Sequence, residues 1–369
     1  MVNRDRIVNE FLELVRIDSL TRHERKMADI LKEKLEGMGL PVYEDDAGDK
    51  IGGDAGNLIC TFKGNKSKPG ILLAAHMDTV IPGTGKKPVI DGDVIKSDGT
   101  TILGGDDVAG IVSILETLRV VQEDGIKHGD IQVVFTVAEE GGLYGAKNLD
   151  YTRINAKYGF VLDSSGDIGS VAVIAPTQNK IDVTVAGKAA HAGMEPERGI
   201  SAIQIASHAI ANMKLGRIDD ETTANIGMIN GGQATNIICD SVEIRAEARS
   251  RDENKLVNQM LHMKDCFEVA AKKFGGSVDF KYELLYPSFR INKNDEIISI
   301  LKKASSLSGI NLKLEPTGGG SDTNIINGKG IKSVDLSVGM DKVHSVEEQI
   351  NINDLVKSAE FVLAIVKSV

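Results

Sequence analysis

Acidic residues and histidines recur where an apolar, strand-like run of this sequence ends or a helix begins. They are His76 and Asp78 in "AAHMDTV", Asp106 and Asp107 in "LGGDDVAG", Glu139 and Glu140 in "FTVAEEGG", Asp163 in "FVLDSSG", and His344 in "DKVHSVEEQ". Open α/β sheets collect their ligand sites at the carboxyl ends of strands. We therefore expect these side chains to converge on one site.

So many carboxylates in one place require a cation. Like charges a few ångströms apart raise one another's pKa and destabilise the fold. Two histidines and three carboxylates make a nitrogen and oxygen ligand set that suits zinc, with manganese or cobalt as alternatives. If one carboxylate bridges, five ligands hold two metal ions about 3.5–4 Å apart, an arrangement that activates water.

The neighbouring glutamates of "FTVAEEGG" raise a geometric question. Adjacent strand residues point to opposite faces, so both carboxylates reach one site only if the backbone turns, which glycine permits. One glutamate would then bind metal while the other acts as general base on the bridging water. Taken singly, each acid also fits a helix cap or a solvated turn, and each histidine a surface or core position.

Hydrophobic periodicity predicts the elements that must position these residues. Apolar residues at helical spacing predict helices over 4–17 and 22–38. Farther along, short apolar runs predict strands at 57–62 and 70–78, the second of them buried, before a helix over 108–122. Buried strands are predicted after that helix, at 131–138 and 158–163. This alternation predicts a mostly parallel sheet with helices on both faces.

The pattern changes near residue 180. The order strand, helix, strand, strand, helix, strand predicts a small βαββαβ domain, with elements at 180–187, 199–213, 222–231, 241–249, 253–274 and 277–283. The α/β pattern returns in a helix over 294–307, a strand over 333–338 and a helix over 353–368. We predict a catalytic α/β domain of residues 1–177 and 287–369, interrupted by an inserted α+β domain of residues 178–286.

Composition excludes several classes of protein. The chain of 369 residues is 41% hydrophobic and 26% charged, as in ordinary globular proteins, with a formal net charge of −10. This charge argues against nucleic acid or an anionic membrane as partner, and no apolar stretch reaches membrane length. Three widely separated cysteines fit a reducing compartment, so we expect a cytoplasmic location.

Six motifs, in order along essentially the whole chain, resemble those of the co-catalytic di-metal exopeptidases that include peptidase T, aminoacylase and glutamate carboxypeptidase. They are "HMDT", "GGDDVAG", "EEGGLYGA", "VLDSSG", "AHAG" and "GGGSDTN". The sequence is most similar to the peptidase T branch. The resemblance implies two zinc ions, a short peptide substrate, and an inserted domain that acts as a lid and forms a homodimer.

The resemblance also implies a role for each site residue. His76 and Asp163 would hold one zinc ion, and Glu140 and His344 the other. Asp106 would bridge the two, joined to Asp107 by a cis peptide bond. A further pair supports the chemistry: Glu139 as general base, and Asp78 as the group that orients His76 through its second ring nitrogen.

Residues outside the metal ligands resemble family residues that contact the substrate. His191 in "AHAG" would stabilise the oxyanion, and Asn236 and Arg249 would bind the substrate, with Arg249 gripping its carboxylate. Arg251 competes for that last role. The run "GGGSDTN" at 318–324, with Gly319 and Gly320, resembles a substrate loop, and a structural turn is its alternative.

The resemblance narrows the expected activity. Asp163 stands where other branches carry glutamate, which resembles the aminopeptidase side of the family and favours release of the N-terminal residue from short peptides. An aminoacylase or carboxypeptidase with the same metals is the alternative. A metal-binding protein without hydrolytic activity is a third reading, and the presence of Glu139 and His191 beside all five ligands argues against it.

Overall fold

The computed structural model describes all 369 residues, which form two compact units. Unit 1 comprises Met1–Ile174, Arg290–Thr317 and Ser321–Val369. Unit 2 comprises Ala175–Phe289 together with Gly318–Gly320. The glycines of the "GGGSDTN" run therefore belong to unit 2, whereas the rest of that run belongs to unit 1.

A nine-stranded sheet forms the centre of unit 1. Its order is β1-β2-β6-β3-β7-β16-β8-β14, with β15 paired to β8. The strands are β1 (Val42–Glu44), β2 (Leu58–Phe62), β3 (Ile71–His76), β6 (Ile131–Thr136), β7 (Tyr158–Ser164), β8 (Ser170–Ala175), β14 (Phe289–Arg290), β15 (Lys313–Pro316) and β16 (Lys332–Ser337). The central strands β6, β3, β7 and β16 are mutually parallel, so their carboxyl ends lie at one edge.

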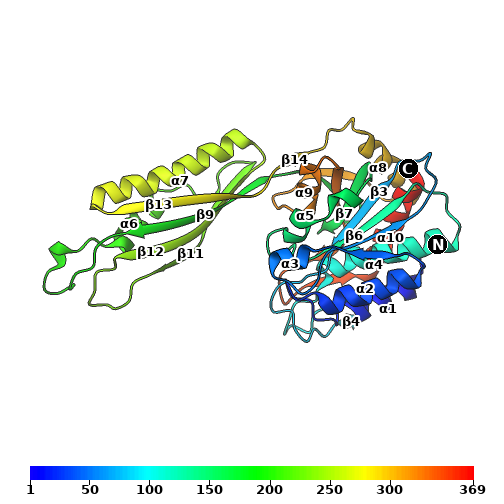
Figure 1. Ribbon diagram of the computed structural model, residues 1–369, viewed down its shortest axis with the longest axis horizontal. Helices are drawn as coiled ribbons and strands as arrows, with labels where there is room; N and C mark the ends of the chain where they lie inside the picture. The colour runs from blue at the N-terminus through cyan, green and yellow to red at the C-terminus, as the bar shows by residue number, and fades with distance from the viewer. The chain divides into compact units, whose positions relative to one another are not determined.

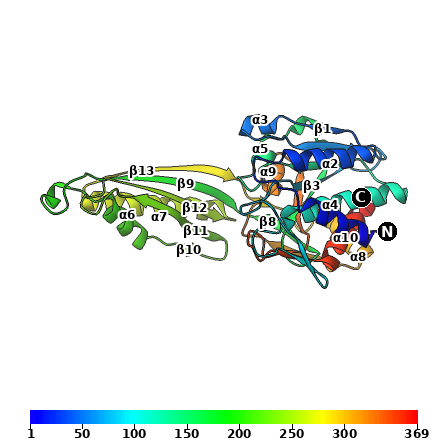
Figure 2. The ribbon, with the colours of Figure 1, turned by 90° about the horizontal axis from the view of Figure 1, so that it is seen from below.

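Helices cover both faces of this sheet, as predicted. They are α1 (Arg4–Leu14), α2 (Arg25–Gly37), α3 (Ala47–Ile51), α4 (Gly105–Glu123), α5 (Tyr144–Asn148), α8 (Glu296–Ser308), α9 (Asp322–Gly328) and α10 (Ile352–Ser368). Within unit 1, α4 packs against β3 and β7 on one face, and α9 packs against β7 and β16 on the other (Figure 1, Figure 2). No helix of the chain has the length and apolar character that crossing a membrane requires.

Burial explains why the central elements are so uniformly apolar. Every residue of β3 and of β6 is buried, as expected for strands with helices on both sides. Helix α4 is buried over most of its length because α1 and α10 pack against it as well. The sheet and α4 therefore give the site a rigid support.

A second, four-stranded sheet in unit 1 was not predicted. It has the order β17-β18-β5-β4 and consists of β4 (Val89–Asp91), β5 (Val94–Lys96), β17 (Met340–Asp341) and β18 (Gln349–Asn351). These strands are two or three residues long, too short for a period-two pattern to emerge. The sheet anchors both ends of the 342–348 segment, which carries His344.

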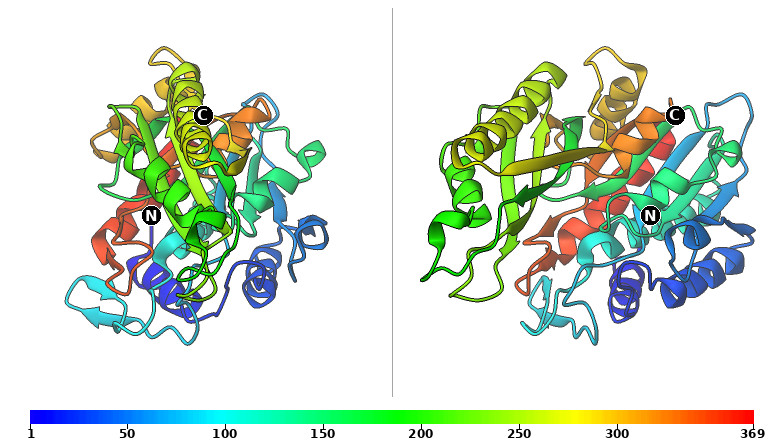
Figure 3. Two further views of the ribbon diagram at one scale, coloured as in Figure 1. Left: turned by 90° about the vertical axis from the view of Figure 1, so that its left-hand side faces the viewer. Right: turned by 60° about the vertical axis from the view of Figure 1, so that its left-hand side comes forward.

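Unit 2 contains the predicted βαββαβ order, with one short extra strand. Its elements are β9 (Thr177–Ala186), α6 (Ala202–Ala211), β10 (Gly216–Arg217), β11 (Thr222–Gly231), β12 (Ser241–Ser250), α7 (Glu253–Phe274) and β13 (Ser277–Tyr286). The sheet is antiparallel, in the order β10-β11-β12-β9-β13. Helices α6 and α7 lie on one face of it (Figure 3).

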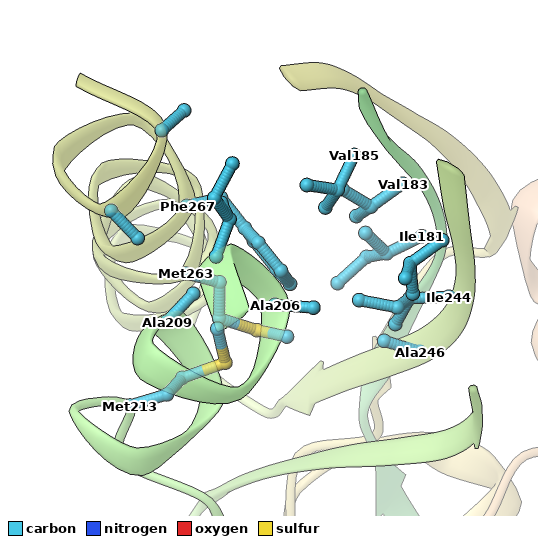
Figure 4. Close-up of a cluster of buried hydrophobic side chains, with 14 of the residues drawn as sticks. Ile181, Val183, Val185, Ala206, Ala209, Met213, Ile244, Ala246, Met263 and Phe267 are labelled. Carbon is cyan, nitrogen blue, oxygen red and sulfur yellow. The ribbon is translucent and has the colours of Figure 1, made fainter. Parts of the chain in front are cut away.

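Unit 2 has a hydrophobic core of its own. Alternate residues of β9, among them Ile181 and Val183, point toward the helices, where Phe267 and Met263 of α7 meet them (Figure 4). Phe267 is completely buried, whereas Val269 on the same helix is 63% exposed. The amphipathic pattern of α7 thus places one face in the core and the other in solvent.

This contrast makes a testable pair of substitutions. Phe267→Ala should lower the free energy of unfolding of unit 2 by about 3–5 kcal/mol, because it removes a large side chain and leaves a cavity. Val269→Ala, the control, should change it by less than about 0.5 kcal/mol. Urea unfolding of the full chain, with limited proteolysis within unit 2, measures both. Equal behaviour of the two variants would contradict the assigned core.

Candidate active site and metal centre

The predicted metal ligands converge within unit 1, at the carboxyl edge of the main sheet. His76 is the last residue of β3, and Asp163 lies next to the end of β7. Glu139 and Glu140 follow β6, and His344 lies in the loop that joins β17 to β18. Since β3, β6 and β7 are parallel neighbours, their ends bring these side chains together.

Asp106 enters the site from the start of α4. The preceding Gly104 has a left-handed backbone conformation with φ of 78°, and the Asp106–Asp107 peptide bond is cis. Asp106 and Asp107 both have non-helical backbone angles, so the regular helix begins after them. The cis bond lies where the family resemblance placed it.

The two carboxylate oxygens of Asp106 face two different histidines. Oδ1 lies 3.0 Å from His76 Nε2, and Oδ2 lies 3.2 Å from His344 Nε2. Each histidine also lies near a second carboxylate: His76 Nε2 is 3.5 Å from Asp163 Oδ1, and His344 Nε2 is 2.7 Å from Glu140 Oε1. The five residues thus form two groups that share Asp106.

These separations fit a metal centre. Two ligand atoms bound tetrahedrally to zinc at about 2.0–2.2 Å lie roughly 3.3–3.6 Å apart. The His76–Asp163 separation of 3.5 Å falls in this range, the two Asp106 separations of 3.0 and 3.2 Å are slightly shorter, and the 2.7 Å between His344 and Glu140 is a direct hydrogen-bond distance that an ion would widen. Two overlapping sets of donor atoms also lie within 4.8 Å of one another, one of His76, Asp106 and Glu140, and one of His76, Glu139 and Asp163. The second set includes the predicted general base.

The charges in the site call for cations. Burial, and then the charge of Asp163, raises the pKa of Glu139 well above its ordinary value. Burial likewise raises the pKa of Asp163, in spite of the opposing effect of His76. Hydrogen bonds with Asp106 and Glu140 raise the pKa of His344 to about 10. Without metal, protons must therefore balance the carboxylates, and divalent ions would take their place.

The backbone turns one residue before the glutamate pair. Ala138 has a φ of 49°, a left-handed conformation that costs an L-residue about 1 kcal/mol. The Glu139 and Glu140 N–H groups donate to Oδ1 and Oδ2 of Asp78 at 2.8 and 3.2 Å. We predicted that glycine would permit this turn, but the turn begins at Ala138. The Asp78 carboxylate, which accepts both N–H groups, stabilises it.

Asp78 contacts His76 differently from the prediction. The Nδ1 atom of His76 lies 2.9 Å from the main-chain carbonyl oxygen of Asp78 and 3.5 Å from its carboxylate. The carboxylate accepts hydrogen bonds from the Glu139 and Glu140 backbone and from Thr21 Oγ1 at 2.7 Å. The carbonyl is thus the nearer acceptor, and the orienting role of the carboxylate stays a prediction.

Several buried acids near the site were not assigned from sequence. Asp335 in β16 accepts a hydrogen bond from the Asp163 N–H at 3.1 Å and one from Ser321 Oγ at 2.8 Å. Glu24 accepts the Ala138 N–H at 3.0 Å. Glu348 accepts N–H groups of Asp106 and of the loop before it. An acid within an apolar strand, such as Asp335 in "SVDLSV", is the signal that would have identified one of them.

The "GGGSDTN" run is only partly a loop. Helix α9 begins at Asp322, and Ser321 is its N-cap in a capping box with Asn324. Ahead of the helix, Gly320 lies against Tyr286, since a Cβ there would come within 2.3 Å of the tyrosine ring. A side chain is therefore excluded at Gly320.

The predicted substrate residues of unit 2 fall into two neighbourhoods. The Ala192 N–H donates to the Asn236 carbonyl at 3.0 Å, so the exposed residues His191 and Asn236 lie on adjacent segments. Arg249 donates from Nε and Nη2 to the two carboxylate oxygens of Glu247, both at 3.0 Å. Arg251, the alternative candidate for binding the substrate carboxylate, instead donates to the Asp220 carbonyl.

Comparison with known proteins gives matches over most or all of the chain. Residues 72–368 match the sequence profile of peptidase family M20/M25/M40. The chain is 50% identical to the uncharacterized protein YqjE of Bacillus subtilis (strain 168), with 100% of this chain and 99% of YqjE covered.

Two solved structures match along the whole chain. The aminopeptidase PepT of Bacillus cereus ATCC 10987 is 48% identical with a TM-score of 0.91, covering 100% of this chain and 99% of that one. A tripeptidase of Staphylococcus aureus subsp. aureus Mu50 is 46% identical with a TM-score of 0.96, covering 100% and 98%.

Metal binding should stabilise the folded chain. Adding Zn²⁺, Mn²⁺ or Co²⁺ to protein stripped with a chelator should raise its Tm, because ions that bind only the folded state add about 2.7 kcal/mol at 100 times Kd. Asp106→Asn, which weakens ligation in both groups, should lose most of that rise. Thermal unfolding followed by circular dichroism measures the shift. An identical Tm with and without each ion would exclude a metal centre here.

Proposed function

The chain belongs to peptidase family M20/M25/M40 and is a metal-dependent exopeptidase, and we propose that it releases the N-terminal residue of short peptides, tripeptides among them. The observation that carries the proposal is the position of Asp106, with one carboxylate oxygen toward His76 and the other toward His344. The aminopeptidase and tripeptidase structures, which match over the full chain, support the direction of cleavage and the substrate length.

We assign His76 and Asp163 to one metal ion and Glu140 and His344 to the other, with Asp106 shared. Zinc is the proposed metal, and manganese or cobalt would suit the same donor atoms. Such a pair of ions, when bound, would polarise the scissile carbonyl group and lower the pKa of water so that the hydroxide nucleophile forms near neutral pH. The chain's own contribution is to hold five side chains at fixed separations.

Glu139 is the proposed general base. Its side chain is buried, and its donor atoms lie within 4.8 Å of those of His76 and Asp163. Asp78 fixes the backbone of Glu139 and Glu140, so the two carboxylates keep separate positions. Glu139 would take a proton from the attacking water and pass it to the leaving amine.

Unit 2 supplies the proposed substrate contacts. His191 would stabilise the oxyanion, and Asn236, on the adjacent segment, would hold the peptide backbone. Arg249 already binds the Glu247 carboxylate through two nitrogens, which is the geometry proposed for the carboxylate of the substrate. Gly319 and Gly320 would let the peptide backbone approach closely.

We further propose that unit 2 acts as a lid and as the dimerisation domain of a homodimer. A cytoplasmic location fits the cysteines, which are all free thiols, two of them buried. Neither nucleic acid nor a membrane is a proposed partner, in keeping with the net charge of −10.

Glu139→Gln tests the general base. The substitution keeps the shape of the side chain but removes its basicity, so kcat for a tripeptide should fall about 10²- to 10⁴-fold. Elemental analysis should find the same metal content as in the wild type. A variant that holds both ions and keeps near-wild-type kcat would refute the role of Glu139.

Blocked substrates test the direction of cleavage. A tripeptide, its N-acetyl form and its C-terminal amide are each incubated with the metal-loaded enzyme, and product is followed by chromatography. We expect N-acetylation to abolish release of the first residue, because a free amino group would no longer be available for recognition. Loss on amidation alone would indicate a carboxypeptidase, and release of acetate would indicate an aminoacylase.

A further inference from the structure

We infer that Glu348 is a positioning residue that sets the place of Asp106 and couples it to the segment carrying His344; the inference rests on the proposed function. Glu348 is only 1% exposed. Its Oε2 accepts the Leu103 and Gly104 N–H groups at 2.7 and 2.9 Å, and its Oε1 accepts the Asp106 N–H at 3.0 Å. One carboxylate therefore holds three N–H groups of the loop that delivers Asp106.

These N–H groups have no partner in the helix itself. They lie before or within the irregular start of α4, where backbone donors need an acceptor from elsewhere. A carboxylate is a strong acceptor for such groups. The loop is also shaped for this contact, because a Cβ at Gly105 would come within 3.1 Å of Glu348 Oε1. Glycine at position 105 thus leaves room for the carboxylate.

Backbone N–H groups, rather than a cation, are the partners of the buried Glu348 carboxylate. The nearby Lys86 Nζ donates to the carbonyl oxygens of Ile17 and Gly83 at 2.8 and 3.0 Å, not to Glu348. Burial lowers the pKa of Lys86 to about 8, although the charges of Asp18 and Glu348 oppose this effect. The contacts of Glu348 with the Asp106 loop are therefore the main interactions of its buried carboxylate.

Glu348 also belongs to the His344 side of the site. Its N–H donates to the Ser345 carbonyl at 3.1 Å, and its carbonyl accepts the Ser97 N–H at 3.0 Å. It follows His344, which has a φ of 61°, by four residues, and it directly precedes β18. A shift of Glu348 would alter the 3.2 Å separation of His344 Nε2 and Asp106 Oδ2, on which the second ion depends.

Glu348→Gln separates positioning from simple packing. The amide keeps the size of the side chain, but its NH₂ group cannot accept a hydrogen bond, so at least one loop N–H loses its acceptor. Glu347→Gln is the matched control, because Glu347 is exposed and pairs only with Lys342 at 3.3 Å. The two variants make the same chemical change at adjacent positions.

The test compares metal binding by metal-free full-length protein. Zn²⁺ affinities are measured by competition with a chelating indicator, and Co²⁺ loading is followed by its visible absorption spectrum. We expect Glu348→Gln to bind at least one ion about 10–100-fold more weakly than wild type and to give an altered Co²⁺ spectrum. With metal in excess, kcat should fall while KM stays within about twofold.

A structural role alone predicts another result. If Glu348→Gln lowers only Tm, with both metal affinities, the Co²⁺ spectrum and kcat equal to those of Glu347→Gln, the inference is wrong. If Glu348→Gln does not fold, Glu348→Asp is measured instead, and wild-type metal affinity in that shorter variant would overturn the inference equally. Failure of wild type and Glu347→Gln to bind two ions or cleave peptides would count against the proposed function rather than against Glu348.

Discussion

Mutual repulsion among buried carboxylates is the constraint that organises unit 1. Asp106, Glu139 and Asp163 lie beside His76 at the carboxyl edge of a sheet that is otherwise closely packed and apolar. Burial first, and then the charges of neighbouring carboxylates, raise the pKa values of Glu139 and Asp163 well above their ordinary range. In the proposed centre, two cations that share Asp106 would relieve this repulsion and supply the hydrolytic chemistry.

A second set of acidic residues hydrogen-bonds to the backbone segments that carry the proposed metal ligands and the general base. Asp78 and Glu24 accept consecutive N–H groups of the turn at Ala138, Asp335 accepts the N–H of Asp163, and Glu348 accepts three N–H groups around Asp106. The segments around Ala138 and Asp106 are irregular, so their backbone donors need acceptors from distant parts of the chain. Carboxylates that accept backbone N–H groups in this way would orient the proposed metal ligands, and they have hydrogen-bond partners without binding a cation themselves.

The sequence predicted those features of the fold and the activity that depend on local hydrophobic patterns and motifs. The α/β class, the helices on both faces and the exopeptidase activity are confirmed. Strands β3 and β6 are continuous apolar runs, α7 has a clear helical periodicity, and the motifs resemble a known family. The short strands β4, β5, β17 and β18 carry too few residues for a pattern. Helix α9 was read as loop because its start is rich in glycine and cap residues. Glu348 lies in the stretch "DKVHSVEEQ" that carries His344, but its hydrogen-bond partners lie more than 240 residues away in the sequence.

An anomalous-scattering experiment tests the central claim most directly. Crystals of the metal-loaded protein are measured at the absorption edge of the bound element, and an anomalous difference map is calculated. The account predicts two peaks about 3.5–4 Å apart, one on each side of the Asp106 carboxylate, with His76 beside one and His344 beside the other. A single peak, or two peaks that do not share Asp106, would contradict it.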